Sequence, residues 1–175
     1  TNNKLWERVS LVYEKRNESN LTKEQIRVSE LYYEMFKRAG AVLSETQKKR
    51  YTDIMQNLAE LGTKFSQNLL SDESSWCLSL DESDLEGLPE FVINSMSQAA
   101  LDRDAKGYAL TLSRSILEPF LQFSSNRKLR EKAYLAWSSR GMNGGDTDNI
   151  NIAKETLTLR TERANILGYN SFADF

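Results

Sequence analysis

The sequence predicts an all-α, mainly helical protein made of antiparallel helical layers. Three observations support this fold class. Only 2 Pro and 8 Gly occur among 175 residues, so helix breakers are scarce. Apolar residues recur at helical spacing through most of the chain. Two of the periodic stretches begin with a capping box, in which Ser or Thr is followed three residues later by Gln. One short two-stranded ribbon is expected near residues 75–80 and 108–112.

The first part of the chain, residues 1–70, is expected to form an up-and-down helical layer. Apolar spacing predicts an amphipathic helix over about residues 4–18, which a polar turn follows. Thr22 and Gln25 form the capping box of a second helix, which Gly40 can close in a left-handed conformation. Ser44 and Gln47 form the capping box of a third helix that runs to about residue 70. Short connections between helices favour antiparallel neighbours.

The second part, residues 71–112, has a mixed pattern. Apolar residues alternate with other residues over 76–80 and again over 108–112, which predicts two short, half-buried strands. The strands are expected to pair as a ribbon that needs helices packed behind it. A turn with a brief helix is expected at 81–88, and Pro89 fits the first position of the next helix.

The third part, residues 113–175, is helical again. A short helix over 116–123 is expected to be interrupted at Pro119, because proline removes a backbone donor and its ring collides with the preceding turn. Ser125 is expected to cap the helix that follows. The glycine-containing segment 141–146 is expected to be a flexible loop.

A final long helix is expected after this loop. Thr147 or Asp148 can cap it, and Gly168 can close it. Ser171 and Phe172 resemble the start of another helix. Residues 1–175 are therefore expected to be a single helical fragment of a larger protein.

Composition limits the classes of function. The net charge of -2 gives no overall electrostatic reason to bind nucleic acid or a membrane. No apolar run approaches the ~20 residues that a transmembrane helix needs. The single Cys77 cannot form an internal disulfide, which favours a reducing, cytoplasmic location. A periplasmic location would require a signal peptide upstream of Thr1.

Histidine is absent from the chain. Imidazole is the usual general base near neutral pH and the commonest ligand of catalytic zinc. Ser-His-Asp, Cys-His and H-E-x-x-H centres are therefore excluded within these residues. We expect no catalytic, cofactor-binding or metal-binding residue in this chain.

Other motifs are incomplete. Ser125 and Lys128 have S-x-x-K spacing, but the S-D-N and K-T-G motifs of penicillin-binding sites are missing. Residues 146–149 resemble the start of an EF-hand, but Asn151 and Leu157 stand where Gly and Glu are required. The glycines of 141–145 match no phosphate-binding loop. Helix capping and a surface loop explain these residues better.

Clusters of charge in the last third have two interpretations. A basic helix face comprises Arg127, Lys128, Arg130, Lys132 and Arg140. Tyr134 and Trp137 lie near it in sequence, which would suit nucleic acid, but Glu131 interrupts the charge and the aromatic rings are expected to pack inward. A solvated face is favoured. Arg160 and Arg163 could anchor a carboxylate or pair with acids of a neighbouring helix, and a structural role is favoured.

Several sequence phrases, in their order and spacing, resemble one family. They are Arg38–Ala41, Phe65–Leu70, Leu85–Pro89, Gly107–Leu112, Arg127–Glu131, Ala136–Arg140, Asp148–Asn149 and Leu159–Tyr169. The resemblance is to the thimet-oligopeptidase-like zinc metallopeptidases, especially the bacterial peptidyl-dipeptidase (dipeptidyl carboxypeptidase) branch. It extends over most of the chain but covers only the non-catalytic part that precedes the catalytic centre of the family.

This resemblance implies a large helical parent protein with a deep channel for short peptides. An H-E-x-x-H helix outside this chain would bind one zinc, and the enzyme would remove dipeptides from free C-termini. The present chain would form part of the channel wall, be inactive alone, and have the catalytic half of the same polypeptide as its partner. Arg130, Arg140, Arg160 and Glu162 match family positions and are assigned to structure. The alternative is a stand-alone helical module that binds a peptide or a protein.

Overall fold

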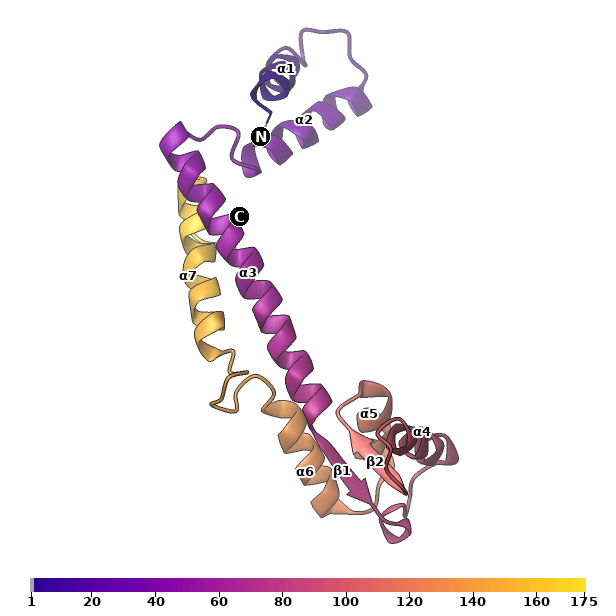
Figure 1. The fold of residues 1–175 in the computed structure, drawn as a ribbon. Helices are drawn as coiled ribbons and strands as arrows, with labels where there is room; N and C mark the ends of the chain where they lie inside the picture. The colour runs from indigo at the N-terminus through magenta and orange to yellow at the C-terminus, as the bar shows by residue number, and fades with distance from the viewer. Residues whose placement is uncertain (1) are drawn as a thin grey trace. The chain divides into compact units, whose positions relative to one another are not determined.

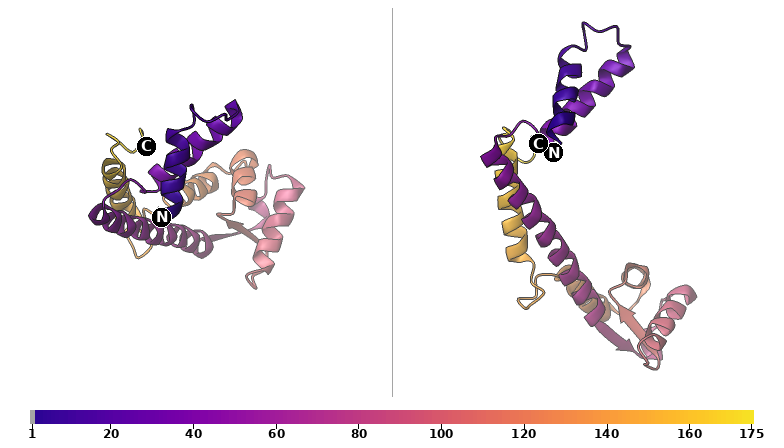
Figure 2. Two further views of the ribbon diagram at one scale, coloured as in Figure 1. Left: turned by 90° about the horizontal axis from the view of Figure 1, so that it is seen from above. Right: turned by 45° about the horizontal axis from the view of Figure 1, so that its top comes forward.

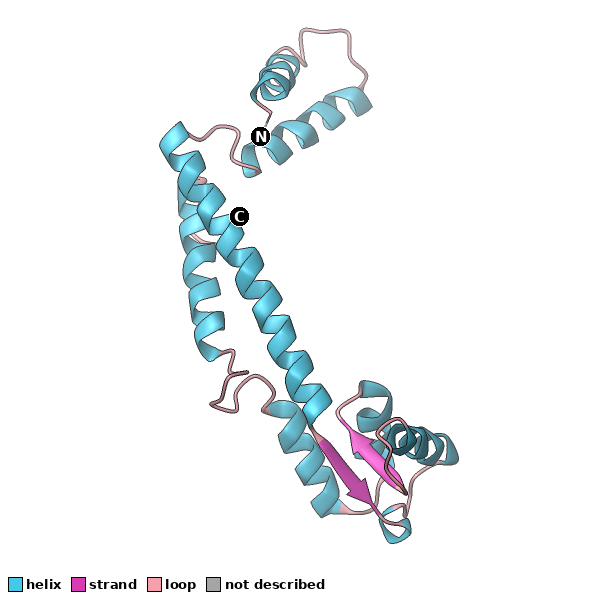
Figure 3. Cartoon of the chain, in the orientation of Figure 1, coloured by secondary structure: helices cyan, strands magenta, loops and turns pink. Residues whose placement is uncertain are grey.

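The computed structural model describes residues 2–175 and divides into two compact units. One contains the described residues up to Glu60 together with Glu155–Phe175, and the other contains Leu61–Lys154. The mainly helical fold class is confirmed, since the described residues form seven α-helices and one two-stranded sheet (Figures 1 and 3). The elements are α1 (Asn3–Glu14), α2 (Lys23–Arg38), α3 (Glu45–Ser75), β1 (Cys77–Leu80), η1 (Glu82–Asp84), α4 (Glu90–Leu101), β2 (Tyr108–Thr111), α5 (Arg114–Phe123), α6 (Arg127–Ser138) and α7 (Ile150–Ile166). Over residues 2–175 no helix combines the length and apolar character that crossing a membrane requires.

Helices α1 and α2 form a hairpin in the first unit (Figure 1). The capping box of α2 is confirmed: the Thr22 amide donates to Gln25 Oε1 at 2.9 Å, and the Gln25 amide donates to Thr22 Oγ1 at 3.3 Å. Helix α1 ends at Glu14, four residues before the predicted end at 18. Residues 14–20 are all polar, so a longer helix would bury no further apolar side chain and would gain no stability from packing.

Aromatic rings hold this hairpin together. The Trp6 ring lies 5.1 Å from the Tyr33 ring and 6.2 Å from the Phe36 ring, measured between centroids. The Tyr13 ring stacks on Tyr33 at 3.9 Å, and the Arg16 guanidinium lies over Tyr13. Even so, neither α1 nor α2 contains a fully buried residue. The hairpin therefore has a contact seam but no closed core.

The first half of α3 and the second half of α7 run antiparallel and side by side in the first unit (Figures 1 and 2). The capping box at the start of α3 is confirmed, because Ser44 and Gln47 exchange the expected hydrogen bonds at 3.0 and 3.4 Å. The buried apolar residues of these segments are Ile54, Leu159 and Ala164. Ala41 and Leu43, in the segment before α3, are the other buried apolar residues in the described part of this unit.

The second unit contains the main hydrophobic core. Strands β1 and β2 pair antiparallel with Leu78 opposite Leu110, which confirms the predicted ribbon. Helices α4 and α5 pack against β2, and α5 also packs against α6 (Figure 3). The largest fully buried side chains of this core are Val92, Met96, Leu110, Leu112, Leu117 and Phe120. Burial of such side chains supplies most of the free energy that stabilises this unit.

Two sequence expectations for this unit are wrong. Helix α5 is continuous past Pro119, because Ile116, Leu117 and Phe120 on its apolar face are buried, and their burial outweighs one lost backbone bond. The cap of α6 is Asn126, whose Oδ1 accepts from the Leu129 amide at 3.3 Å. Ser125 donates instead through its amide and its hydroxyl to the carbonyl oxygen of Glu86.

Boundaries of other helices differ by smaller amounts. Pro89 precedes α4 as its N-cap residue, one position before the predicted one. Helix α7 begins at Ile150, so Asn149 and not Thr147 or Asp148 occupies the cap position, while Asp148 Oδ1 accepts from the Ile150 amide at 2.8 Å just before the helix. The described residues after Gly168 form turns and not a helix, although the Ser171 hydroxyl accepts from the Asp174 amide as a cap would.

We predict that Phe120→Ala lowers the free energy of unfolding by about 3–5 kcal/mol, because it leaves a cavity among fully buried neighbours. Urea unfolding followed by circular dichroism measures this change. Leu101→Ala is the matched control at a 63% exposed apolar position and should change stability by less than about 1 kcal/mol. Equal losses for the two variants would contradict the assignment of the core.

Candidate functional site

A polar junction joins the end of α3 to the segment before α7 within the second unit. Asp72 Oδ2 accepts from the Gly141 amide at 2.7 Å and from Asn143 Nδ2 at 3.0 Å. Asp72 Oδ1 accepts from the Thr147 hydroxyl at 2.5 Å. The hydrogen bond from Gly141, followed by those from Thr147 and Asn143, lowers the pKa of Asp72 below its ordinary value of 3.8, with a further contribution from the charge of Arg140. The loop expected to be flexible is thus tied to α3 by one carboxylate.

Two buried amides complete this junction. Asn68 Nδ2 donates to Asn149 Oδ1 at 2.9 Å, and Asn149 Nδ2 donates to the carbonyl oxygen of Phe65 at 3.0 Å. Both asparagines are buried, so an unpaired amide here would destabilise the fold. Gly141 has a φ of +68°, and a Cβ at this position would lie 2.9 Å from Asn149 Nδ2. Only glycine therefore fits where the loop crosses Asn149.

Arg140, in the loop after α6, contacts the end of α3. Its guanidinium pairs with the Glu73 carboxylate and lies 3.3 Å from the centroid of the Trp137 ring. Arg140 Nε donates to the carbonyl oxygen of Trp137 at 3.0 Å. Burial lowers the pKa of Arg140, and the charge of Asp72 opposes this shift. The chemistry of this cluster is that of a structural clamp, because every charge in it has an internal partner.

The other residues at family positions also have internal partners. Arg130 donates to the carbonyl oxygen of Ser124. Arg160 lies over the ring of Phe172 at 5.3 Å. Glu162 binds Arg50 through two hydrogen bonds of 2.6 and 2.7 Å, and these bonds lower the pKa of Glu162 and raise that of Arg50. The ion pair between α3 and α7 therefore joins Arg50 to Glu162, whereas Arg160 and Arg163, which were expected to pair with acids of a neighbouring helix, lie over aromatic rings.

Arg163 and Tyr134 complete the residues discussed from sequence. The Arg163 guanidinium lies 4.6 Å from the centroid of the Phe175 ring. The expectation that both aromatic residues of α6 pack inward is half wrong: Trp137 packs against the core, whereas Tyr134 is exposed. Leu135, the next residue along the helix, is exposed as well.

The described residues 2–175 contain no group of three or more Cys, Asp or Glu side chains placed to hold a metal ion. The carboxylates described above all have partners. Glu73 and Glu162 each pair with an arginine, and Asp72 accepts hydrogen bonds from amide and hydroxyl groups. Nothing in these clusters resembles a free general base or a vacant set of ligands.

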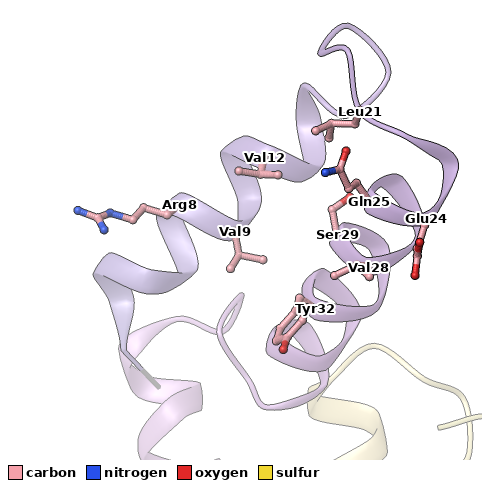
Figure 4. A pocket seen from close by; sticks show the side chains of 9 residues that line it. All are labelled: Arg8, Val9, Val12, Leu21, Glu24, Gln25, Val28, Ser29 and Tyr32. Carbon is pink, nitrogen blue, oxygen red and sulfur yellow. The ribbon is translucent and has the colours of Figure 1, made fainter.

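The hairpin of α1 and α2 carries a mainly apolar hollow with a volume of about 570 Å³ (Figure 4). Val9 and Val12 of α1 line one wall, and Val28 and Tyr32 of α2 line the other. Leu21 lies at the end formed by the connecting loop (Figure 4). We call this hollow, with its nine lining residues, the hairpin groove. Its full lining is Arg8, Val9, Val12, Leu21, Glu24, Gln25, Val28, Ser29 and Tyr32.

Sequence reasoning did not find the hairpin groove. It assigned Val9 and Val12 to the apolar face of an amphipathic helix, and such a face is normally covered. The aromatic seam with Tyr33 and Phe36 covers only one part of that face. The signal that could have found the groove is that α1 and α2 each carry more apolar positions than one helix–helix contact can cover.

Comparison with known proteins identifies the family. Residues 120–175 match the family model described as Peptidase family M3. The chain is 38% identical over 144 residues to oligopeptidase A of Haemophilus influenzae, which covers 79% of the chain and 21% of that relative. It is 27% identical over 174 residues to dipeptidyl carboxypeptidase of Escherichia coli, which covers 98% of the chain and 26% of that relative. The family prediction is confirmed, and the chain is related by homology to the peptidases of family M3.

The relatives differ in how much of the chain they match and in how similar they are to it. Oligopeptidase A of Escherichia coli is 35% identical over 143 residues, which again covers 79% of the chain. Identity is therefore higher with oligopeptidase A, whereas the match to dipeptidyl carboxypeptidase is longer. The chain spans about a fifth to a quarter of the length of these curated relatives.

We predict that Asp72→Asn destabilises the second unit near neutral pH and has little effect in strong acid. The folded-state pKa of Asp72 is lowered, so its carboxylate stabilises the fold above the ordinary pKa, and this stabilisation is lost as the pH falls through the lower folded-state value. Urea unfolding at pH 7 and below pH ~3 measures the difference. Asp146→Asn, at an exposed position in the same loop, is the control. The same loss at both pH values would show that the charge of Asp72 is not what matters.

Proposed function

We propose that this chain is a helical wall segment of a zinc-dependent peptidase of family M3, with the metal and the catalytic groups supplied by other polypeptide. The observation that carries the proposal is homology to peptidases in a chain that contains no histidine. Catalytic zinc sites in proteins depend on imidazole and carboxylate ligands around an open position. A peptidase relative without imidazole is therefore expected to act as scaffold.

The arrangement of charges supports a scaffold role. The carboxylates of Asp72, Glu73 and Glu162 are engaged by internal donors and cations. The residues of this chain do not fit a zinc ion, because the sequence has no histidine and residues 2–175 contain no grouped set of acidic ligands. We therefore assign binding of the metal and activation of water to polypeptide outside these 175 residues.

The proposed substrates of the whole protein are short peptides that enter a channel. The proposed reaction is cleavage of peptide bonds, either release of dipeptides from free C-termini or internal cleavage of short peptides. The longer match to dipeptidyl carboxypeptidase supports the first and the higher identity to oligopeptidase A supports the second. We place the whole protein in the cytoplasm, consistent with its single free Cys77.

The alternative function is that of a stand-alone helical module that binds a peptide or protein. The hairpin groove favours this alternative, since it is concave and mainly apolar. The genomic open reading frame distinguishes the two proposals: continuation into an H-E-x-x-H motif supports the peptidase segment, and a stop codon directly after Phe175 supports the module.

We predict that the purified 175-residue chain binds less than about 0.1 equivalents of zinc after dialysis and does not cleave peptides, because catalytic zinc sites are built from ligand sets that this chain lacks. Elemental analysis and mass spectrometry of a short reporter peptide incubated with the chain make the two measurements. Zinc close to one equivalent, or cleavage that survives repeated purification, would contradict the proposed division of roles.

A further inference from the structure

Strand β1 is an edge of the small sheet in the second unit. It pairs with β2, and within residues 2–175 no further strand adjoins it. In an antiparallel pair, alternate residues direct both their backbone N–H and C=O groups toward the partner strand, and the residues between them direct both groups away. Half of the backbone groups of β1 therefore face away from β2, where a further extended chain can pair with them.

The sequence of β1 leaves this edge open to pairing. Natural sheet edges are commonly protected by lysine, by proline or by a bulge. The strand reads Cys-Leu-Ser-Leu, with no charge and no proline, and its Cys77 and Ser79 are exposed. By contrast, Ala109, Leu110 and Thr111 of β2 are buried, and α4 and α5 pack against that strand. The accessible edge of the sheet is thus β1.

A mainly apolar hollow of about 550 Å³ lies alongside this edge, and we call it the edge hollow. Trp76 and Leu78 line it from the strand, and Leu135 and Ala136 line it from α6, which lies on the other side of β1 from β2 (Figure 1). Met142, in the loop after α6, lines it as well. A chain paired with β1 directs alternate side chains to the same face, so an apolar side chain can enter the edge hollow.

Charge distinguishes one end of the edge hollow from the other. Lys132 is the first residue of α6 that lines it, and Met142, beyond the end of α6, is the last. No acidic residue lines the edge hollow in the described part of the chain. A lysine ammonium at one end of an apolar hollow is complementary to a carboxylate. A peptide with a free C-terminus carries such a carboxylate directly after its last side chain.

The position of α6 argues against a second copy of the chain as the occupant. Two copies that paired through β1 would each have to insert the strand together with the α6 that lies beside it. Such a pair would also supply no carboxylate to Lys132, since the edge hollow has no acidic lining. A single extended chain meets both requirements.

We propose that the edge of β1 and the edge hollow bind the C-terminal end of a short peptide in extended conformation. The peptide pairs with β1 through its backbone, places an apolar side chain against Leu135 and Met142, and sets its terminal carboxylate beside Lys132. Because β1 has four residues, about four residues of the peptide can pair with it. This inference goes beyond the proposed function, since strand pairing requires neither zinc nor cleavage.

The first test examines the backbone pairing with the unaltered 175-residue chain. The probe is an N-acetylated hexapeptide of alternating threonine and leucine with a free C-terminus, and isothermal titration calorimetry measures its affinity. Two further peptides carry N-methyl groups on the even or on the odd residues. We expect one set of methyl groups to weaken binding at least about tenfold, because it removes the N–H groups that pair with β1, and the other set to change it less than about twofold. Equal effects of the two sets, or no binding at about 1 mM peptide, would overturn the inference.

The second test examines the side chains of the edge hollow. Lys132→Gln should weaken binding of the free-acid peptide about two- to fivefold and leave binding of the C-terminally amidated peptide unchanged. Leu135→Ser should weaken both peptides at least about threefold. Tyr134→Ser is the matched control, because Tyr134 is 57% exposed on the same helix, Leu135 is 56% exposed, and Tyr134 does not line the edge hollow. Circular dichroism checks that each variant is folded. An equal effect of Lys132→Gln on the two peptides would contradict the placement of the terminal carboxylate.

Other occupants give different results. Sedimentation of the chain as a dimer that Leu135→Ser dissociates, and that the peptide does not displace, would show that a second copy occupies the edge. If the open reading frame extends beyond Phe175, the same titration is made with its complete product. Loss of binding there would show that a strand of the added polypeptide covers β1, and the inference would be wrong. Each of these failures leaves the proposed peptidase function standing, because the open reading frame decides that function separately.

Discussion

The second unit depends on the polar junction between the end of α3 and the loop before α7. Asp72 gathers donors from Gly141, Asn143 and Thr147, and a buried amide pair lies directly beside it. Because the amides of Asn68 and Asn149 are buried, each must find its partner within the protein, and they bond to each other and to the carbonyl oxygen of Phe65. The junction thereby fixes where α7 begins.

This constraint supports the proposed scaffold role. A carboxylate that already accepts three hydrogen bonds has its pKa lowered and is a poor general base near neutral pH. Arg140, bound to Glu73 and stacked on Trp137, is similarly occupied. In contrast to these charges, the hollow on α1 and α2 is mainly apolar and open.

Much of the fold could be predicted because local chemistry decides it. The capping boxes at Thr22 and Ser44 and the alternation that forms the ribbon depend on residues close in sequence. Expectations failed where a distant contact overruled a local rule. Pro119 lies inside α5 because apolar residues before and after it are buried in the core. Ser125 does not cap α6 because its hydroxyl donates to the carbonyl oxygen of Glu86. The absence of an assigned catalytic residue remains a prediction.

The sequence by itself determined that this protein is helical and that it has no imidazole with which to bind zinc or to transfer a proton, since composition and periodicity are properties of the chain alone. Only the tertiary structure decided which charges meet and which apolar faces stay open. Periodicity shows that a helix has an apolar face, but the partner of that face lies elsewhere in the chain. The pairing of Arg50 with Glu162, 112 positions apart, and the open groove beside Val28 were therefore visible only after folding.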